Sequence, residues 1–160
     1  MTYYLRAGDA ALRLYANDEA VAHYNRALEV ARRPGVEAPP WKRLFLGRGR
    51  ALELSSRYEE ARDGYLEAEE LAHALEDREL ELAVLMASAT IHASPTAVHD
   101  VLTAQDLCDR ALVLARELGD REAEARILWN LLLLHERSGR ADQALIHGER
   151  ALTLARELGS

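Results

Sequence analysis

A nine-residue segment of the sequence recurs almost unchanged 40 residues later. Residues 111–119, ALVLARELG, reappear as residues 151–159, ALTLARELG, and the only difference is the exchange of Val113 for Thr153. A repeat of this length encodes one small unit that cannot bury its own apolar face alone. The sequence therefore predicts an array of stacked units, and 160 residues provide for about four of them.

The composition favours helices over strands. Hydrophobic residues make up 49% of the chain, but aromatic residues only 6%, and most of the apolar residues are Ala and Leu. Apolar periodicity and Gly or Pro breaks predict eight helices, at residues 3–16, 18–33, 41–55, 57–75, 78–93, 95 or 100–118, 121–137 and 140–158. We expect the side chains of Asn17, Ser56, Asp77 and Asp120 to cap helix N-termini, with Glu59 completing a capping box with Ser56.

The second helix of each predicted pair carries a recurring series of small, large and small residues. The four series are Ala20, Tyr24, Ala27; Ala61, Tyr65, Ala68; Ala104, Cys108, Ala111; and Ala144, Gly148, Ala151. Together with a glycine in the first helix, Gly8 or Gly49, this pattern resembles the tetratricopeptide repeat family. The resemblance implies an all-α, right-handed α-solenoid of four helix-turn-helix pairs. We expect a single domain over residues 1–160, with repeats at about 1–34, 40–76, 77–119 and 120–160.

The later repeats depart from that pattern. Cys108 and Gly148 replace the aromatic residue, Leu132 stands where the family prefers glycine, and Pro95 lies in a longer turn. The wording of these repeats is similar to long-period arrays in large bacterial ATPase, LuxR-type and cyclase-like regulators. We therefore expect a fragment of a longer cytoplasmic bacterial regulator.

The resemblance also implies a ligand groove on the first helices of the pairs, lined by arginines and one large aromatic residue. The expected groove residues are Arg6, Arg13, Arg50, Met86, Thr90, Arg126, Trp129, Asn130, Leu133 and Arg137. Such a lining suits an acidic or extended protein segment. The alternative is that these arginines form weak ion pairs with neighbouring carboxylates on solvated faces. The lysine and asparagine positions of the family's chaperone-tail clamp hold other residues here.

Other functions are disfavoured by the sequence. A net charge of −7 argues against a nucleic-acid binder, and no apolar run is long enough to cross a membrane. Cys108 is the only cysteine, and the spacing of His92, His99 and Asp100 matches no metal motif, so we expect no metal or other cofactor. Without a recognisable catalytic motif, we expect no enzyme.

Two rival functions remain open. One is self-association into a homodimer through the apolar face of the last helix, at Leu152, Leu154 and Leu158. The other is the sensing of a small-molecule effector in the groove.

Overall fold

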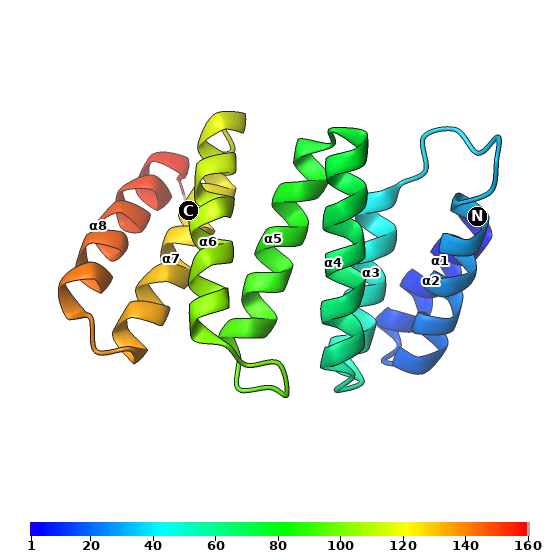
Figure 1. Cartoon of the computed structure of the whole chain (residues 1–160), viewed down its shortest axis with the longest axis horizontal. Coiled ribbons are helices and arrows are strands. Elements are labelled where there is room, and N and C mark those ends of the chain that lie inside the picture. Colours follow the sequence, from blue (N-terminus) through cyan, green and yellow to red (C-terminus); the bar gives the residue numbers. More distant parts are fainter. Residues whose placement is uncertain (160) are drawn as a thin grey trace. The chain divides into compact units, whose positions relative to one another are not determined.

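The computed structural model describes residues 1–159, and the regular structure in this range is α-helical throughout (Figure 1). Its helices are α1 (Thr2–Arg13), α2 (Asn17–Ala31), α3 (Trp41–Leu54), α4 (Tyr58–Leu75), α5 (Arg78–Ala93), α6 (Val101–Leu118), α7 (Arg121–Arg137) and α8 (Ala141–Leu158). The chain forms two compact units, Met1–Val84 and a second that begins at Leu85, within α5. The eight predicted helices are therefore present among the described residues, with changes of a few residues at their ends.

In the first unit, α1 packs on α2, α2 on α3, and α3 on α4. Tyr24 of α2 and Tyr65 of α4 are 1% and 2% exposed, so both rings lie in the core between helices. The two rings occupy the space that side chains at positions 47 and 49 of α3 would need. A Cβ atom on Gly47 would approach the Tyr24 ring to 2.5 Å, and one on Gly49 would approach the Tyr65 hydroxyl to 2.3 Å. Glycine at these two positions therefore allows the helices to come close.

The phenol groups of both buried tyrosines have hydrogen-bond partners. The Tyr24 hydroxyl donates to Asp9 Oδ1 over 2.6 Å, and the Tyr65 hydroxyl donates to Glu53 Oε1 over 2.7 Å. Burial raises the pKa of each phenol above its usual value, and the neighbouring carboxylate raises it further. Each hydroxyl therefore stays protonated and keeps its hydrogen bond.

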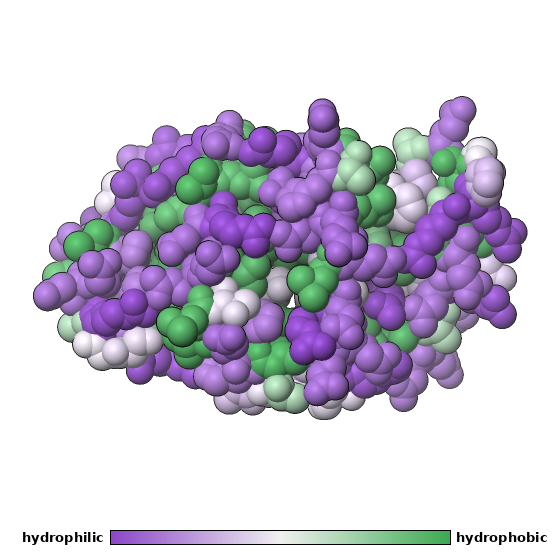
Figure 2. All heavy atoms as spheres, in the orientation of Figure 1, coloured by the Kyte–Doolittle hydropathy of each residue, from purple (hydrophilic) through white to green (hydrophobic). Residues whose placement is uncertain are grey.

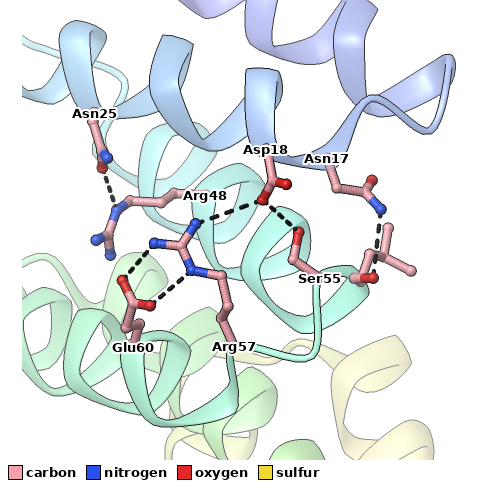
Figure 3. A network of polar contacts seen from close by, with 8 residues as sticks. Asn17, Asp18, Asn25, Arg48, Ser55, Arg57 and Glu60 are labelled. Carbon is pink, nitrogen blue, oxygen red and sulfur yellow. Dashed lines mark hydrogen bonds and ion pairs between the residues drawn. The ribbon is translucent and has the colours of Figure 1, made fainter.

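A polar network joins the ends of α2, α3 and α4 (Figure 3). Arg57 binds both oxygens of Glu60 over 2.7 Å, and its Nη1 atom lies 3.7 Å from Asp18 Oδ1. That carboxylate oxygen also accepts a 3.3 Å hydrogen bond from the Ser55 hydroxyl. A separate pair also joins α2 and α3, since Arg48 Nε donates to Asn25 Oδ1 over 2.6 Å.

Two of the capping predictions are wrong. Asn17 is the first residue of α2 rather than its cap, and its side-chain amide donates instead to the carbonyl of Leu54 over 3.4 Å. Ser56 lies in the preceding turn at φ 59°, and Arg57 occupies the N-cap of α4, where its side chain makes no capping hydrogen bond. The capping box of Ser56 and Glu59 is therefore not formed, because Ser56 lies in the turn one residue before the N-cap.

The remaining capping predictions are confirmed. Asp77 accepts a 2.9 Å hydrogen bond from the backbone of Leu80, and Asp120 accepts one of the same length from Ala123. The open choice for the start of α6 is settled by Asp100, which accepts from two backbone amides of the first turn and places the start at Val101. These carboxylates satisfy amides that the helix itself leaves unpaired.

In the second unit, α6 packs on α7 and α7 on α8. Here the large and small residues of the repeat change places. A Cβ atom on Gly148 of α8 would lie 2.4 Å from Leu132 Cδ1, so the leucine of α7 fills the space that a tyrosine of the second helix fills in the first unit. Repeat three has two small residues at the corresponding positions, Ala89 and Cys108, and both are buried.

Hydrophilic residues cover most of the face drawn in Figure 2, and hydrophobic residues appear between them in patches. The apolar residues most exposed on α8 are Leu145 and Ile146, at 63% and 59%. Among residues 1–159, no helix combines the length and the apolar character that a bilayer crossing requires.

Candidate protein-binding groove

A cavity of about 900 Å³ opens between α5, α7 and α8 in the second unit. Its lining consists of Met86, Ala87, Thr90, Glu122, Ala125, Arg126, Trp129, Asn130, Gly148, Ala151, Leu152, Ala155 and Leu158. We call this cavity the α7–α8 groove.

Helical periodicity explains why these residues share one surface. The α7 residues at positions 122, 125, 126, 129 and 130 are three or four residues apart and lie on one face of the helix. The same spacing joins positions 148, 151, 152 and 155 of α8. The residues at the centre of both faces are alanine and glycine, and their small side chains leave the space that forms the groove.

The groove exposes apolar side chains of unusual size for a solvated surface. Trp129 is 56% exposed, Leu152 is 51% exposed and Leu158 is 44% exposed. Single exposed apolar residues are normal, but three around one cavity form a patch of the kind that marks interaction sites.

The polar groups of the groove come mainly from α7. Arg126 is exposed and forms no ion pair within residues 1–159, so its guanidinium group is available to a ligand. Asn130 is half-buried beside it, and Glu122 places one carboxylate at the N-terminal end of the same face. A ligand would therefore meet an apolar floor with a cation in the middle.

The structure brings together half of the residues predicted for the groove. Met86, Thr90, Arg126, Trp129 and Asn130 all line it. Leu133 and Arg137 lie further along α7, outside the lining.

Arg137 is engaged elsewhere, since its Nη1 atom donates to the carbonyl of Ala93 over 3.0 Å. Arg6, Arg13 and Arg50 belong to the first unit and are exposed there. Arg50 pairs with Glu53 at 3.1 Å, as the ion-pair alternative predicts.

The groove residues predicted from the sequence did not include those of α8, which form one wall of the groove. The sequence assigned Leu152, Leu154 and Leu158 to a face for self-association, but Leu154 is only 6% exposed and belongs to the core. The assignment of Leu154 is therefore wrong, because it lies on the opposite side of α8 from Leu152. Helical spacing from Trp129 would have found Ala125 and Glu122, which lie four and seven residues before it.

The rings of His92 and His99 bind backbone carbonyl groups in the turn before α6. His92 Nδ1 lies 2.7 Å from the carbonyl of Val98, and His99 Nδ1 lies 2.9 Å from that of Ser94, so both rings hold the turn before α6. Among the described residues, no three side chains of His, Cys, Asp or Glu come together as metal ligands would.

His135 and His147 stack in the second unit, with ring centroids 5.1 Å apart and planes inclined by 8°. Burial lowers the pKa of both imidazoles, and Arg140 lowers that of His135 further, whereas Asp109 acts in the opposite direction on both. The rings therefore stack in the neutral form near pH 7.

Cys108 is buried. Burial raises the pKa of its thiol to about 12, and Asp109 adds to the effect. A thiol of that kind is unreactive near neutral pH.

These features define a helical-repeat protein with a groove on one of its units. Residues 96–157 match the family model of the tetratricopeptide repeat, so the resemblance predicted from the small–large–small series is confirmed for this stretch. A comparison with curated proteins gives no match.

Among solved structures, the apo form of RapI is similar to the chain. The two share 16% sequence identity and superpose with a TM-score of 0.87, over 99% of this chain and 56% of RapI. The chain thus spans just over half the length of that protein. The likeness confirms the fold class, an all-α solenoid of helix-turn-helix pairs.

Proposed function

We propose that the chain is a protein-recognition module whose α7–α8 groove binds an acidic segment with a bulky apolar side chain. The observation that carries the proposal is the position of an exposed Trp129 and of Arg126, which has no ion pair within residues 1–159, in a groove lined by small residues. Tryptophan and arginine are the residues that most often dominate the binding energy of interfaces.

The volume and the charge of the groove support this partner. A cavity of about 900 Å³ accepts several side chains of a bound segment. The guanidinium group of Arg126 can form two parallel hydrogen bonds to one carboxylate. The chain as a whole carries a net charge of −7, so a partner carboxylate gains its specific attraction at Arg126 rather than from the overall field.

Tetratricopeptide repeats are a fold of protein-interaction scaffolds, so the module acts by binding rather than by catalysis. A place in a cytoplasmic bacterial signalling or transcription regulator is the finer part of our proposal. Its support is the wording of the repeats, such as ARELGDREAEAR at residues 115–126.

The test is capture of a partner from a lysate of the source organism. The immobilised chain is compared with a groove variant, Arg126→Glu with Trp129→Ala, after circular dichroism has shown that both are folded. A matched control carries the same kinds of change at exposed positions outside the groove, Arg33→Glu with Tyr3→Ala.

We expect a protein that the wild type and the control retain and the groove variant loses. Equal retention by all three chains would contradict the groove as the binding site. Stabilisation of the chain by a metabolite in a thermal melt, lost in the groove variant, would favour effector sensing instead.

A further inference from the structure

We propose that the contact between His135 and His147 is a pH switch for the α7–α8 groove, which keeps its shape at neutral pH and loosens under mildly acidic conditions. This inference rests on the proposed function, since it concerns the regulation of the same groove.

The width of the groove depends on how closely α7 packs on α8, because each of these helices supplies one wall. Leu132 of α7 lies against Gly148 of α8, and Gly148 is itself part of the lining. The stack of His135 and His147 continues the same contact toward the turn that joins the two helices. A change at the stack therefore acts on the groove through a contact that both share.

The position of His135 holds apolar residues in the first two repeats. Ala11, Leu52 and His135 each lie three residues after the position that contacts the second helix of the pair, which is 8, 49 or 132. All three residues are buried. Packing at this place therefore does not require an ionisable ring, and the imidazole gives the contact a property that the apolar residues lack, which is the ability to take up a proton.

The folded contact provides no acceptor for a proton at His135. Its Nδ1 atom is buried and has no hydrogen-bond partner among the described residues. In an imidazolium ion both ring nitrogens carry hydrogen, so protonation would turn this atom into a buried donor on a cation. A donor of that kind is costly without an acceptor, and water reaches it only when the contact with α8 opens.

The surroundings of the two rings disfavour protonation in the folded chain. Burial is the main cause of the lowered pKa of both imidazoles; Arg140 at the N-cap of α8 adds to it for His135, and Arg116 of α6 for His147. Asp109 of α6 is the counter-charge and favours protonation of both rings. The pair is therefore neutral near pH 7 and takes up protons below the ordinary histidine pKa of 6.5, where two charged rings would also repel each other.

Tryptophan fluorescence tests the switch, because the sequence has one tryptophan in each unit. Trp129 lines the groove and is the remaining reporter in a Trp41→Phe chain, whereas Trp129→Phe leaves Trp41 as a reporter on the first unit. We expect the Trp129 signal to change between about pH 7.5 and 5.5, with a midpoint below 6.5, and the Trp41 signal to stay constant. Acrylamide quenching of Trp129 should rise by less than about twofold, because the ring is already 56% exposed.

Substitutions of the histidines assign the response. His135→Leu, which introduces the residue of repeat two, should abolish the change in the Trp129 signal. His147→Gln alters only the half-buried ring and tests the same contact if His135→Leu does not fold. His23→Gln, in the first unit, is the matched control and should leave the response as it is in the wild type.

Changes to the surrounding charges should move the midpoint in opposite directions. Arg140→Gln removes a like charge from the vicinity of His135 and should raise the midpoint. Asp109→Asn removes the counter-charge and should lower it.

Three results would overturn the switch. The first is a Trp129 signal that stays constant over the whole pH range. The second is a response that neither histidine variant removes. The third is a simultaneous change of both tryptophan reporters and of the helical circular dichroism, which would show unfolding of the whole chain rather than a loosened groove.

The two proposals fail in different ways. A partner captured through Arg126 and Trp129 equally well on both sides of the transition would keep the proposed function and overturn the switch. Absence of any partner sensitive to Arg126 and Trp129 would overturn the proposed function, while the fluorescence of Trp129 would still decide whether the groove responds to pH.

Discussion

In repeats one, two and four, the contact between the two helices pairs one large residue with glycine, although the residues differ. Glycine faces tyrosine in repeats one and two, where Gly8 lies against Tyr24 and Gly49 against Tyr65. In repeat four, Leu132 lies against Gly148, so the large residue has moved to the other helix. Close packing explains the constraint, because a pair of large residues would overfill the space and a pair of small ones would leave a void.

This arrangement predicts unequal effects of the same substitution. Gly49→Ala places a methyl group against the buried, hydrogen-bonded ring of Tyr65, and we expect it to lower the free energy of unfolding by about 1–3 kcal/mol. Gly148→Ala meets only the end of the Leu132 side chain, which can change rotamer, so the loss should be smaller. Urea denaturation of the two variants tests this order. A larger loss for Gly148→Ala would contradict it.

The stacked histidines predict a pH dependence of stability. Both pKa values are lowered by burial, so the unfolded chain takes up protons before the folded chain does. Stability should therefore be retained above the ordinary histidine pKa of 6.5 and fall as the pH drops below it. The measurement is the free energy of unfolding between about pH 5 and 8.

His135→Phe keeps a flat ring in the stack and should reduce this slope. It also removes a buried Nδ1 atom that has no hydrogen-bond partner among the described residues. His23→Gln, a change at a histidine of the first unit, is the matched control. An unchanged slope in His135→Phe would assign the pH dependence to other groups.

At the scale of the element, three turns between helices of a pair use the left-handed backbone region. Tyr15, Ser56 and Gly139 hold equivalent places before α2, α4 and α8, with φ values of 58°, 59° and 70°. Only glycine adopts this region without steric cost. The turn geometry is thus common to these three repeats, but only the third turn has a glycine, Gly139, at the position with positive φ.

Ser56→Gly should therefore be tolerated or slightly stabilising, by a few tenths of a kcal/mol up to about 1 kcal/mol. Asp100→Ala should instead cost about 1 kcal/mol, because it removes the acceptor for two amides of α6. Thermal melts of the two variants provide the comparison. A destabilising Ser56→Gly would show that the serine side chain has a role in the turn after all.

The helices were predictable because their signals are local. Apolar spacing, Asp77, Asp120 and Gly119 act within one or two turns of the helix that they define. Ser56 and Asn17 were misassigned because the residue types that cap helices also occur in turns. The positive φ at Ser56 cannot be inferred from its residue type.

At the scale of the whole chain, Cys108 reports on unfolding. Its thiol is 2% exposed and has a pKa of about 12, so a thiol reagent at pH 8 should react with the native chain only when α6 and its neighbours open. The labelling rate should rise with urea in parallel with the loss of helix. Rapid labelling of the native chain would contradict the buried position.

A cysteine at the exposed position 113, in a chain with Cys108→Ala, is the matched control. It should label at once in the folded and the unfolded chain alike.

The groove was only half predictable because it depends on distant parts of the sequence. Arg126 and Trp129 follow from the family pattern on one helix. Leu152 and Ala155 join the site because α8 packs beside α7, and this contact between two helices cannot be inferred from residue spacing within one helix. Arg50 and Arg137 show the converse, since nearby acceptors already occupy them.

The exchange of Leu132 and Gly148 also bears on how such arrays change over generations. In repeat four the large residue lies on the first helix, and in repeats one and two it lies on the second. A recombination event with its breakpoint between the two helices of a pair would therefore place a leucine against a tyrosine, or a glycine against a glycine, at this contact. A breakpoint between repeats would carry the matched pair intact. We therefore expect duplications of whole helix pairs to preserve this packing, and duplications of single helices to disturb it.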